Sequence, residues 1–289
     1  MTLIPEEIEA HYQLGFEAGR LLEAQGELER LRTEAILRRF LPPAPATIVD
    51  VGGASGAYAF PLAAQGYQVH LIDPVALHLE QARARAESSG VELASIALGD
   101  ARELDLPGTI ADAVLLLGPL YHLTDHSDRL RALREARRIL KPEGVLFAAA
   151  ISRFASLIDG LARGAFPDHR FRAIVAADLE SGQHRNPTDN PAYFTTAYFH
   201  RPEELAAEVR DSGFDHVRVL AVEGPAWSAT HFQQAWDSEQ QRTDLLQFLS
   251  SIEEEPSILG ASAHLLAVAH HSILSASTGS TAVARREGK

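Results

Sequence analysis

The chain has 289 residues, of which 46% are hydrophobic and 22% charged, and a formal net charge of −13. This length suits one α/β domain with insertions and a sizeable core. An acidic chain without a basic cluster is a poor nucleic-acid binder, because that affinity comes mostly from neutralised phosphates. The chain lacks cysteine, which excludes disulfides, thiolate metal sites and cysteine nucleophiles. No apolar run has the length of a bilayer span and the acidic start is unlike a signal peptide, so we expect a cytoplasmic protein without membrane contact.

The first half of the chain alternates between helical and extended patterns. Residues 6–40 are predicted to be helical, because apolar residues recur at helical spacing as far as Pro42-Pro43. Strands are then expected at 47–52, 68–73, 92–98, 111–117 and 144–151, with helices near 57–65, 75–89 and 127–140 between them. Near-continuous apolar strands that alternate with helices indicate a parallel sheet covered on both faces.

The pattern changes after Ile151 and then resumes. Residues 152–200 are expected to be irregular and are rich in aromatic side chains, and a helix at 202–212 and a strand at 216–223 follow. Residues 229–254 are predicted to be largely helical, and the last strand is expected at 264–270. The small, polar segment 273–289 is expected to be a disordered tail.

Three loops at the ends of consecutive strands carry polar or glycine residues. The first is the glycine-rich turn VDVGGASG at 49–56, the second is Asp73-Pro74, and the third is Gly99-Asp100-Ala101. In an open parallel sheet, ligands bind beyond the carboxyl ends of the strands. Glycines let a ligand lie against the backbone, and a carboxylate at the end of the second strand can accept hydrogen bonds from both ribose hydroxyls. The turn lacks the G-x-G-x-x-G register, which favours a nucleoside without a pyrophosphate.

The stretches VDVGGASG, LIDP, GDA and LLLGPLYHL resemble the class I S-adenosylmethionine-dependent methyltransferases, in particular those that act on small molecules. The resemblance covers residues 47–151 well and 201–271 more loosely. It implies a Rossmann-like methyltransferase fold, with a mostly parallel seven-stranded sheet, helices on both faces, a final antiparallel strand and an inserted lid or substrate lobe. It also implies four regions: an N-terminal helical cap (1–42), the cofactor-binding domain (43–151 and 201–272), the inserted lobe (152–200) and the tail.

The resemblance implies a role for each residue of the three loops, with S-adenosyl-L-methionine as the cofactor. The glycine turn would contact the methionine part, Asp73 the ribose, and Asp100 with Ala101 the adenine. Asp50 would either orient the loop or reach the amino group of the cofactor. The cofactor-binding set that it implies is Tyr12, Arg20, Asp50, Gly52, Gly53, Ala54, Gly56, Asp73, Pro74, Asp100, Ala101 and Leu117. Ala54 is a departure, because the family places the middle glycine of the turn there. In related small-molecule methyltransferases a helix before the first strand covers the cofactor, so Tyr12 or an arginine, Arg20 or Arg32, would meet its carboxylate. The alternative for these arginines is a solvated helix face.

The loop after the fourth strand lies where the methyl group should emerge. His122 is a candidate general base, because its ordinary pKa suits proton removal from a hydroxyl or ring nitrogen. The alternative is a histidine that only shapes the loop. Tyr121 is the second candidate in the catalytic set, as a residue that packs on the cofactor or binds the substrate.

Aromatic residues after Ile151 are the candidates for the substrate pocket. The predicted substrate-binding residues are Phe154, Tyr193, Tyr198, His200 and Trp227. Aromatic walls would suit a ring-containing substrate. The alternative is that these side chains form the small core of the inserted lobe. The histidines have no metal-ligand spacing, so we expect no metal.

The sequence thus predicts methyl transfer to a small, aromatic or heterocyclic metabolite by in-line displacement. A methyltransferase acting on RNA or protein, and a non-catalytic protein that binds the cofactor for regulation, are the alternatives. The sequence leaves open whether the chain forms a homo-oligomer.

Overall fold

The computed structural model of the protein describes residues 4–13, 24–188 and 190–272. The strands are β1 (Thr47–Val51), β2 (Gln68–Asp73), β3 (Ser95–Leu98), β4 (Ala111–Leu116), β5 (Leu140–Ser152), β6 (Gln183–His184), β7 (Ala197–His200), β8 (Asp215–Ala221) and β9 (His264–His270). The helices are α1 (Glu6–Gln13), α3 (Ala24–Phe40), α4 (Ala59–Ala64), α5 (Ala76–Ser89), α6 (Pro119–His122), α7 (His126–Ile139), α8 (Ala155–Arg163), α9 (His169–Ser181), α10 (Pro202–Asp211), α11 (Phe232–Trp236), α12 (Glu239–Ile252) and α13 (Pro256–Leu259). Two short 3₁₀ turns, η1 (Pro191–Tyr193) and η2 (Gly224–Ser228), complete the set.

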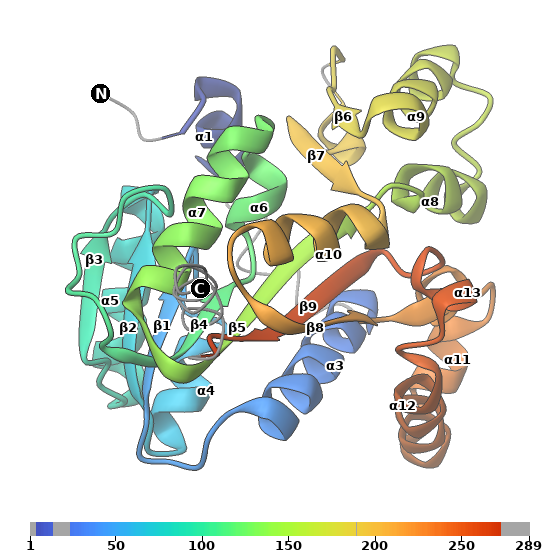
Figure 1. Ribbon diagram of the computed structural model, residues 1–289. Coiled ribbons are helices and arrows are strands. Elements are labelled where there is room, and N and C mark those ends of the chain that lie inside the picture. The colour runs from blue at the N-terminus through green and yellow to red at the C-terminus, as the bar shows by residue number, and fades with distance from the viewer. Residues whose placement is uncertain (1–3, 14–23, 189, 273–289) are drawn as a thin grey trace, which may run out of the picture.

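The strands form one sheet, which lies at the centre of the molecule (Figure 1). Its order is β3-β2-β1-β4-β5, followed on one side of β5 by β9 and then β8. β1 to β5 are parallel, whereas β9 is antiparallel to both β5 and β8. The expected mostly parallel α/β fold with a final antiparallel strand is confirmed.

Helices cover both faces of the sheet because successive strand residues point to opposite sides. In β5, Leu146 and Ala148 pack into one core with residues of α7 and α10. Phe147, between them, packs into a second core with residues of α3, α4 and α5. The continuous apolar run of this strand is therefore explained by burial on both faces.

The carboxyl ends of β1, β2, β3 and β4 meet at one edge of the sheet. Pairing in register joins Val51 to Ile72 and Asp73 to Leu98. The loops that follow these strands are consequently neighbours. β5 continues beyond the end of β4, since Leu116 pairs with Ala148 and four more residues of β5 follow.

The strand count and the inserted segment differ from the prediction of seven strands and an irregular region. The sheet of the described residues has nine strands, because residues 152–200 contribute β6 and β7 as well as α8 and α9. β7 pairs with β5 at Ile151 and Ser152, where β5 extends past β4 and its edge is open to another strand. Figure 1 shows these elements as a separate lobe at the upper right.

Two expectations concern residues outside the described part. The predicted helix at 6–40 corresponds to α1 and α3, and residues 14–23 between them lie outside the described residues, as does the tail at 273–289. Within the described ranges, no helix combines the length and the apolarity needed to cross a bilayer.

Candidate active site

A cavity of about 300 Å³ opens at the carboxyl edge of the sheet. The loops after β1 to β4 form its floor, and residues of α1 and α3 line it from the other side. Twelve of the predicted site residues line this one cavity: Tyr12, Asp50, Gly52, Gly53, Ala54, Asp73, Pro74, Asp100, Ala101, Leu117, Tyr121 and His122. The structure thus brings together residues that are far apart in the sequence.

The glycine-rich turn after β1 needs its glycines for two physical reasons. Gly52 and Gly56 have φ values of +69° and +83°, which side-chain-bearing residues rarely adopt. Gly53 has no space for a side chain, because a β-carbon there would lie 2.5 Å from Asp50 Oδ2. Ala54 also has a positive φ of 49°, and its N–H donates to Asp73 Oδ2 at 2.9 Å. Alanine at the middle position of the turn thus adopts a left-handed conformation and is held there by this hydrogen bond.

Asp50 is a buried carboxylate without a hydrogen-bond partner among the described residues. It is 0% exposed and neither side-chain oxygen has a partner there. Burial, together with the nearby charge of Asp73, raises the pKa of Asp50 to about 7. An unpaired buried carboxylate is costly, and a bound cation would offset that cost. The side chain thus fits a ligand that brings an ammonium group to this end of the cavity.

Asp73 ends β2 and is held by the loop around it. Its Oδ1 accepts hydrogen bonds from the Val75 N–H and from His78 Nδ1, each at 2.9 Å. Oδ2 accepts from the Ala54 N–H and keeps a second lone pair, which a ribose hydroxyl could use. His78 also lines the cavity, and its ring lies 5.1 Å from that of Tyr12. The sequence interpretation did not include His78, although its place in the first turn after Asp73 is a usable signal.

Asp100 follows β3 and is paired with Arg102, which the sequence interpretation also missed. Arg102 contacts Asp100 at 2.5 Å and Asp128 at 2.6 Å. Burial opposes the ionisation of Asp100, but hydrogen bonds from the side chain and backbone of Arg102 hold its pKa below the ordinary value. Asp100 is therefore an ionised hydrogen-bond acceptor at the end of the cavity that would receive an adenine amino group.

His122 connects α6 to two other parts of the chain. Its Nε2 lies 2.5 Å from the Tyr12 hydroxyl of α1, and its Nδ1 lies 3.4 Å from the Thr196 carbonyl oxygen. The ring of Tyr121 packs edge-on against it, at a centroid distance of 4.7 Å. Arg20, the predicted partner of the cofactor carboxylate, lies outside the described residues. Arg32, its alternative, is buried and donates to the Val222 carbonyl and to Glu253.

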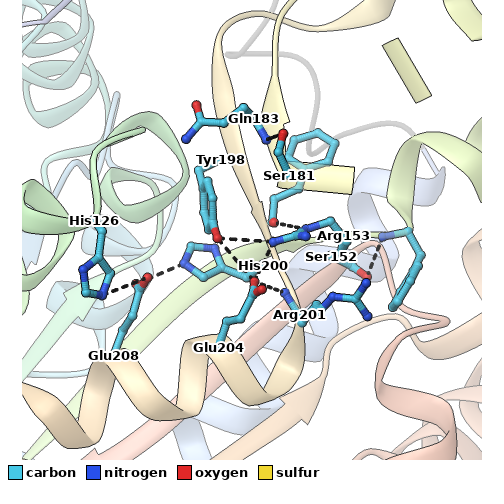
Figure 2. Close-up of polar contacts among 12 residues, drawn as sticks. His126, Ser152, Arg153, Ser181, Gln183, Tyr198, His200, Arg201, Glu204 and Glu208 are labelled. Atoms are coloured by element: carbon cyan, nitrogen blue, oxygen red, sulfur yellow. Dashed lines mark hydrogen bonds and ion pairs between the residues drawn. The ribbon is translucent and has the colours of Figure 1, made fainter. Parts of the chain in front are cut away.

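The five predicted substrate-binding residues are not among the lining residues of this cavity. Tyr198 and His200 belong to a polar network beside it, which Figure 2 shows. The Arg129 guanidinium lies 3.7 Å from the centre of the Tyr198 ring. Burial lowers the pKa of His200, whose neutral ring donates from Nε2 to Glu208 at 3.1 Å.

The other three residues pack elsewhere. Trp227 is buried in a core with α11 and α12, and its indole N–H donates to the Ala261 carbonyl. The Tyr193 hydroxyl donates to Asp168, and the Phe154 ring lies against Gly260. All five side chains thus pack against other parts of the protein and do not face the cavity. Gly56 shapes the turn beneath the cavity without lining it.

The far end of the cavity is lined by residues that no motif indicated. Glu29 of α3 and His264 of β9 line it, and the buried Glu223, at the end of β8, lies directly behind His264. Single ligand atoms of these three residues lie within 4.8 Å of one another. Such a group can hold a metal ion or a proton, although His264 Nδ1 already pairs with Glu223 Oε1 at 2.5 Å. The expectation of no metal stays a prediction.

A parallel sheet with a cavity at its carboxyl edge, lined by the loops after successive strands, is typical of a Rossmann-like cofactor-binding protein. A sequence profile of the family described as "Methyltransferase domain" matches residues 48–144. A ubiquinone/menaquinone biosynthesis C-methyltransferase UbiE from Acidiphilium cryptum is 31% identical, over 62% of this chain and 70% of its own length. A ubiquinone biosynthesis O-methyltransferase from Methylocella silvestris is 32% identical, over 52% of this chain and 65% of its own length. The chain belongs to the class I S-adenosylmethionine-dependent methyltransferases.

The solved structures agree in fold. A SAM-dependent methyltransferase from Thermotoga maritima superposes with a TM-score of 0.56 and 18% identity, covering 92% of this chain and 100% of that one. At this identity the likeness concerns the fold alone. The alignments cover about two thirds of the length of the curated relatives. S-adenosylmethionine is the cofactor of the family, and the unpaired Asp50 fits its ammonium group.

Proposed function

We propose that the protein transfers the methyl group of S-adenosylmethionine to a small, ring-containing acceptor through a hydroxyl or ring N–H group. The observation that carries this proposal is that the cavity is covered. Ile8 and Tyr12 of α1 and Thr33 of α3 line it opposite the sheet. A covered space of about 300 Å³ suits small-molecule ligands, whereas RNA or a protein segment needs an extended open groove.

The cofactor and the acceptor would bind at different ends of the cavity. Asp50 would bind the cofactor's ammonium group, Asp73 the ribose and Asp100 the adenine, because each carboxylate lies at or just beyond the end of a different neighbouring strand. Neighbouring strands lie about 4.8 Å apart, so the cofactor would extend across the ends of β1, β2 and β3. The ends of β5, β8 and β9 are then left for the acceptor. The bound cofactor supplies an activated methyl group, and the protein aligns the acceptor and excludes water.

Three tyrosines give the cavity an aromatic lining: Tyr12, Tyr58 and Tyr121. Flat side chains of this kind favour an aromatic or heterocyclic acceptor by stacking and edge contacts. The relatives named for ubiquinone biosynthesis support an acceptor of this class. Tyr121 and His122 would form the wall beside the reacting atoms.

The N-terminal region and the inserted lobe would cover the site together. Thr196 Oγ1, between η1 and β7, donates to Glu7 Oε1 of α1 at 3.0 Å, and Thr195 Oγ1 donates to the Glu7 carbonyl at 3.3 Å. The lobe thus fastens α1 over the cavity. We propose that residues 1–42 act as a cap, and that residues 152–200 act as its support and not as a direct wall of the pocket.

The test is incubation with methyl-labelled S-adenosylmethionine and a panel of catechols and hydroxyquinones, read by mass spectrometry. We expect label in at least one small phenol with stoichiometric S-adenosylhomocysteine. Parallel incubations contain bulk RNA and a protein extract. Label in those fractions alone, or cofactor binding without transfer to any fraction, would contradict the proposal in favour of a macromolecular acceptor or a regulatory role.

A further inference from the structure

The acceptor end of the cavity contains a histidine that a buried carboxylate orients. β8 is antiparallel to β9, so the end of β8 and the beginning of β9 meet at the carboxyl edge of the sheet. This topology places Glu223, just after β8, behind His264, the first residue of β9. Glu29 of α3 approaches the same ring nitrogen, with its Oε2 at 3.8 Å from His264 Nδ1.

Glu223 is fixed by several hydrogen bonds. It is 2% exposed, and its Oε2 accepts from the Ser262 hydroxyl at 2.8 Å and from the His264 N–H at 3.0 Å. Its Oε1 lies 2.5 Å from His264 Nδ1. Because a carboxylate accepts, Nδ1 carries the proton, and Nε2 is the ring atom that holds the lone pair. This is the arrangement in which a carboxylate sets the tautomer of a catalytic imidazole.

We propose that His264 is the general base of the methyl transfer and that Glu223 is the residue that positions it. This inference rests on the proposed function, because it requires an acceptor with an O–H or N–H group. As the acceptor oxygen forms its bond to the methyl carbon, the carbon–sulfur bond breaks and its electron pair stays on sulfur. The acceptor proton moves to His264 Nε2 and later to solvent. The carboxylates of Glu223 and Glu29 offset the charge of the imidazolium.

His122, the base expected from the sequence, has different surroundings. Its ring nitrogens face the Tyr12 hydroxyl and the Thr196 carbonyl, which are neutral groups that connect the cap to the lobe. His264 instead has two carboxylates near Nδ1, and these stabilise a protonated ring. We therefore assign proton removal to His264 and assign to His122 the positioning of α1.

The first experiment measures the tautomer without any turnover. In cofactor-free protein with ¹⁵N-labelled histidine, two-bond ¹H–¹⁵N spectra show which ring nitrogen is protonated, and His264→Gln assigns the signals. We expect the neutral ring to be protonated at Nδ1. In Glu223→Gln both tautomers should be populated, because an amide can donate as well as accept. A neutral ring protonated at Nε2 in the parent protein would overturn the assignment.

The second experiment compares catechol with the more acidic 4-nitrocatechol as acceptor. In His264→Ala we expect kcat to fall by roughly 10²–10⁴ for catechol, with less loss for 4-nitrocatechol, because its hydroxyl is already partly ionised. Added imidazole should restore part of the activity, and binding of S-adenosylhomocysteine should be unchanged. The control is His169→Ala, whose side chain is 82% exposed on α9.

The outcomes separate this inference from the proposed function. A parent protein that methylates neither catechol contradicts the acceptor class, and the tautomer measurement still decides the orientation of His264. If the parent is active, a loss of kcat below about tenfold in His264→Ala overturns the assignment of His264 as the general base. A loss of kcat that imidazole does not reverse overturns it as well. Inactivation of the parent by a chelator, with recovery on adding Mg²⁺, overturns it in favour of a metal at Glu29, Glu223 and His264.

Discussion

The two ends of the cavity are built in different ways. The cofactor end consists of three loops that follow β1, β2 and β3, and its polar residues Asp50, Asp73 and Asp100 occur in one stretch of the chain. The end proposed for the acceptor combines α3 with the junction of β8 and β9, and Glu223 and His264 there are 41 residues apart.

This difference indicates which features members of a family can share, namely the backbone of the turns, and which can vary between them, namely side chains from distant elements. The cofactor end depends on backbone conformation, since left-handed turns and missing β-carbons leave few alternatives for each residue. The acceptor end depends on side chains from distant elements, which can change without altering the sheet. Substitutions at the cofactor end should therefore affect binding more strongly and through identifiable collisions.

The largest effect is expected for Gly53→Ala. The new β-carbon would lie 2.4 Å from Leu71 Cδ1 and 2.5 Å from Asp50 Oδ2. Overpacking costs about 1–3 kcal/mol and a lost charged hydrogen bond about as much again, so the cofactor Kd should rise by roughly 100-fold or more. Calorimetric titration with S-adenosylhomocysteine measures it. Gly90→Ala, where nothing lies within 4 Å of the added carbon, is the control for backbone strain and should leave Kd unchanged.

Removal of the ribose carboxylate is expected to have the next largest effect. Asp73→Ala should weaken S-adenosylhomocysteine binding by roughly 5- to 150-fold, or about 1–3 kcal/mol. The matched variant Asp112→Ala also removes a carboxylate, but from the beginning of β4, where Asp112 pairs with Lys141. If both variants bind equally well, Asp73 does not contact the cofactor. Melting temperatures of both variants show how much of the loss reflects the loop that Asp73 holds.

The sequence predicted which loops after β1, β2 and β3 line the cavity, because local chemistry determines them. A glycine turn between a strand and a helix, followed by acidic residues at successive strand ends, has few structural solutions, and all three loops line the cavity. The acceptor end could not be predicted in this way. Nothing near His264 in the sequence indicates that Glu223 will face it, since their contact arises from pairing of β8 with β9. Aromatic density after Ile151 suggested a pocket, whereas Tyr198 packs under Arg129.

A pH dependence is expected from Asp50. Its pKa is raised to about 7 in the folded protein, and a bound ammonium favours the ionised form. Affinity for S-adenosylhomocysteine should therefore fall about tenfold per pH unit below 7, as the carboxyl group takes up a proton that binding must displace. Asp50→Asn should abolish this slope between pH 5.5 and 7. A parent protein whose affinity is constant across that range would place the ammonium elsewhere.

The same raised pKa has a consequence for the stability of the cofactor-free protein. Because the folded pKa of Asp50 exceeds its ordinary value of 3.8, the folded state binds more protons than the unfolded state between these values. The contribution of this group to stability is fully present below about pH 4 and is lost as the pH rises through 7. At pH 8, Asp50→Asn should therefore melt at a higher temperature than the parent protein. Thermal unfolding of both proteins at pH 8 can check this expectation.

The smallest effect is expected where the lobe fastens the cap. Thr196→Val keeps the shape of the side chain but removes the hydroxyl that donates to Glu7 at 3.0 Å. Loss of one such hydrogen bond, about 0.5–1.5 kcal/mol, should speed cofactor release by roughly 2- to 10-fold, because α1 opens more often. Stopped-flow displacement measures the rate.

The control is Thr188→Val, which loses a hydroxyl contact to Asn186 within the lobe and should release cofactor at the parent rate. Equal acceleration in both variants would mean that lobe stability controls release, and the contact between Thr196 and α1 would then have no separate role.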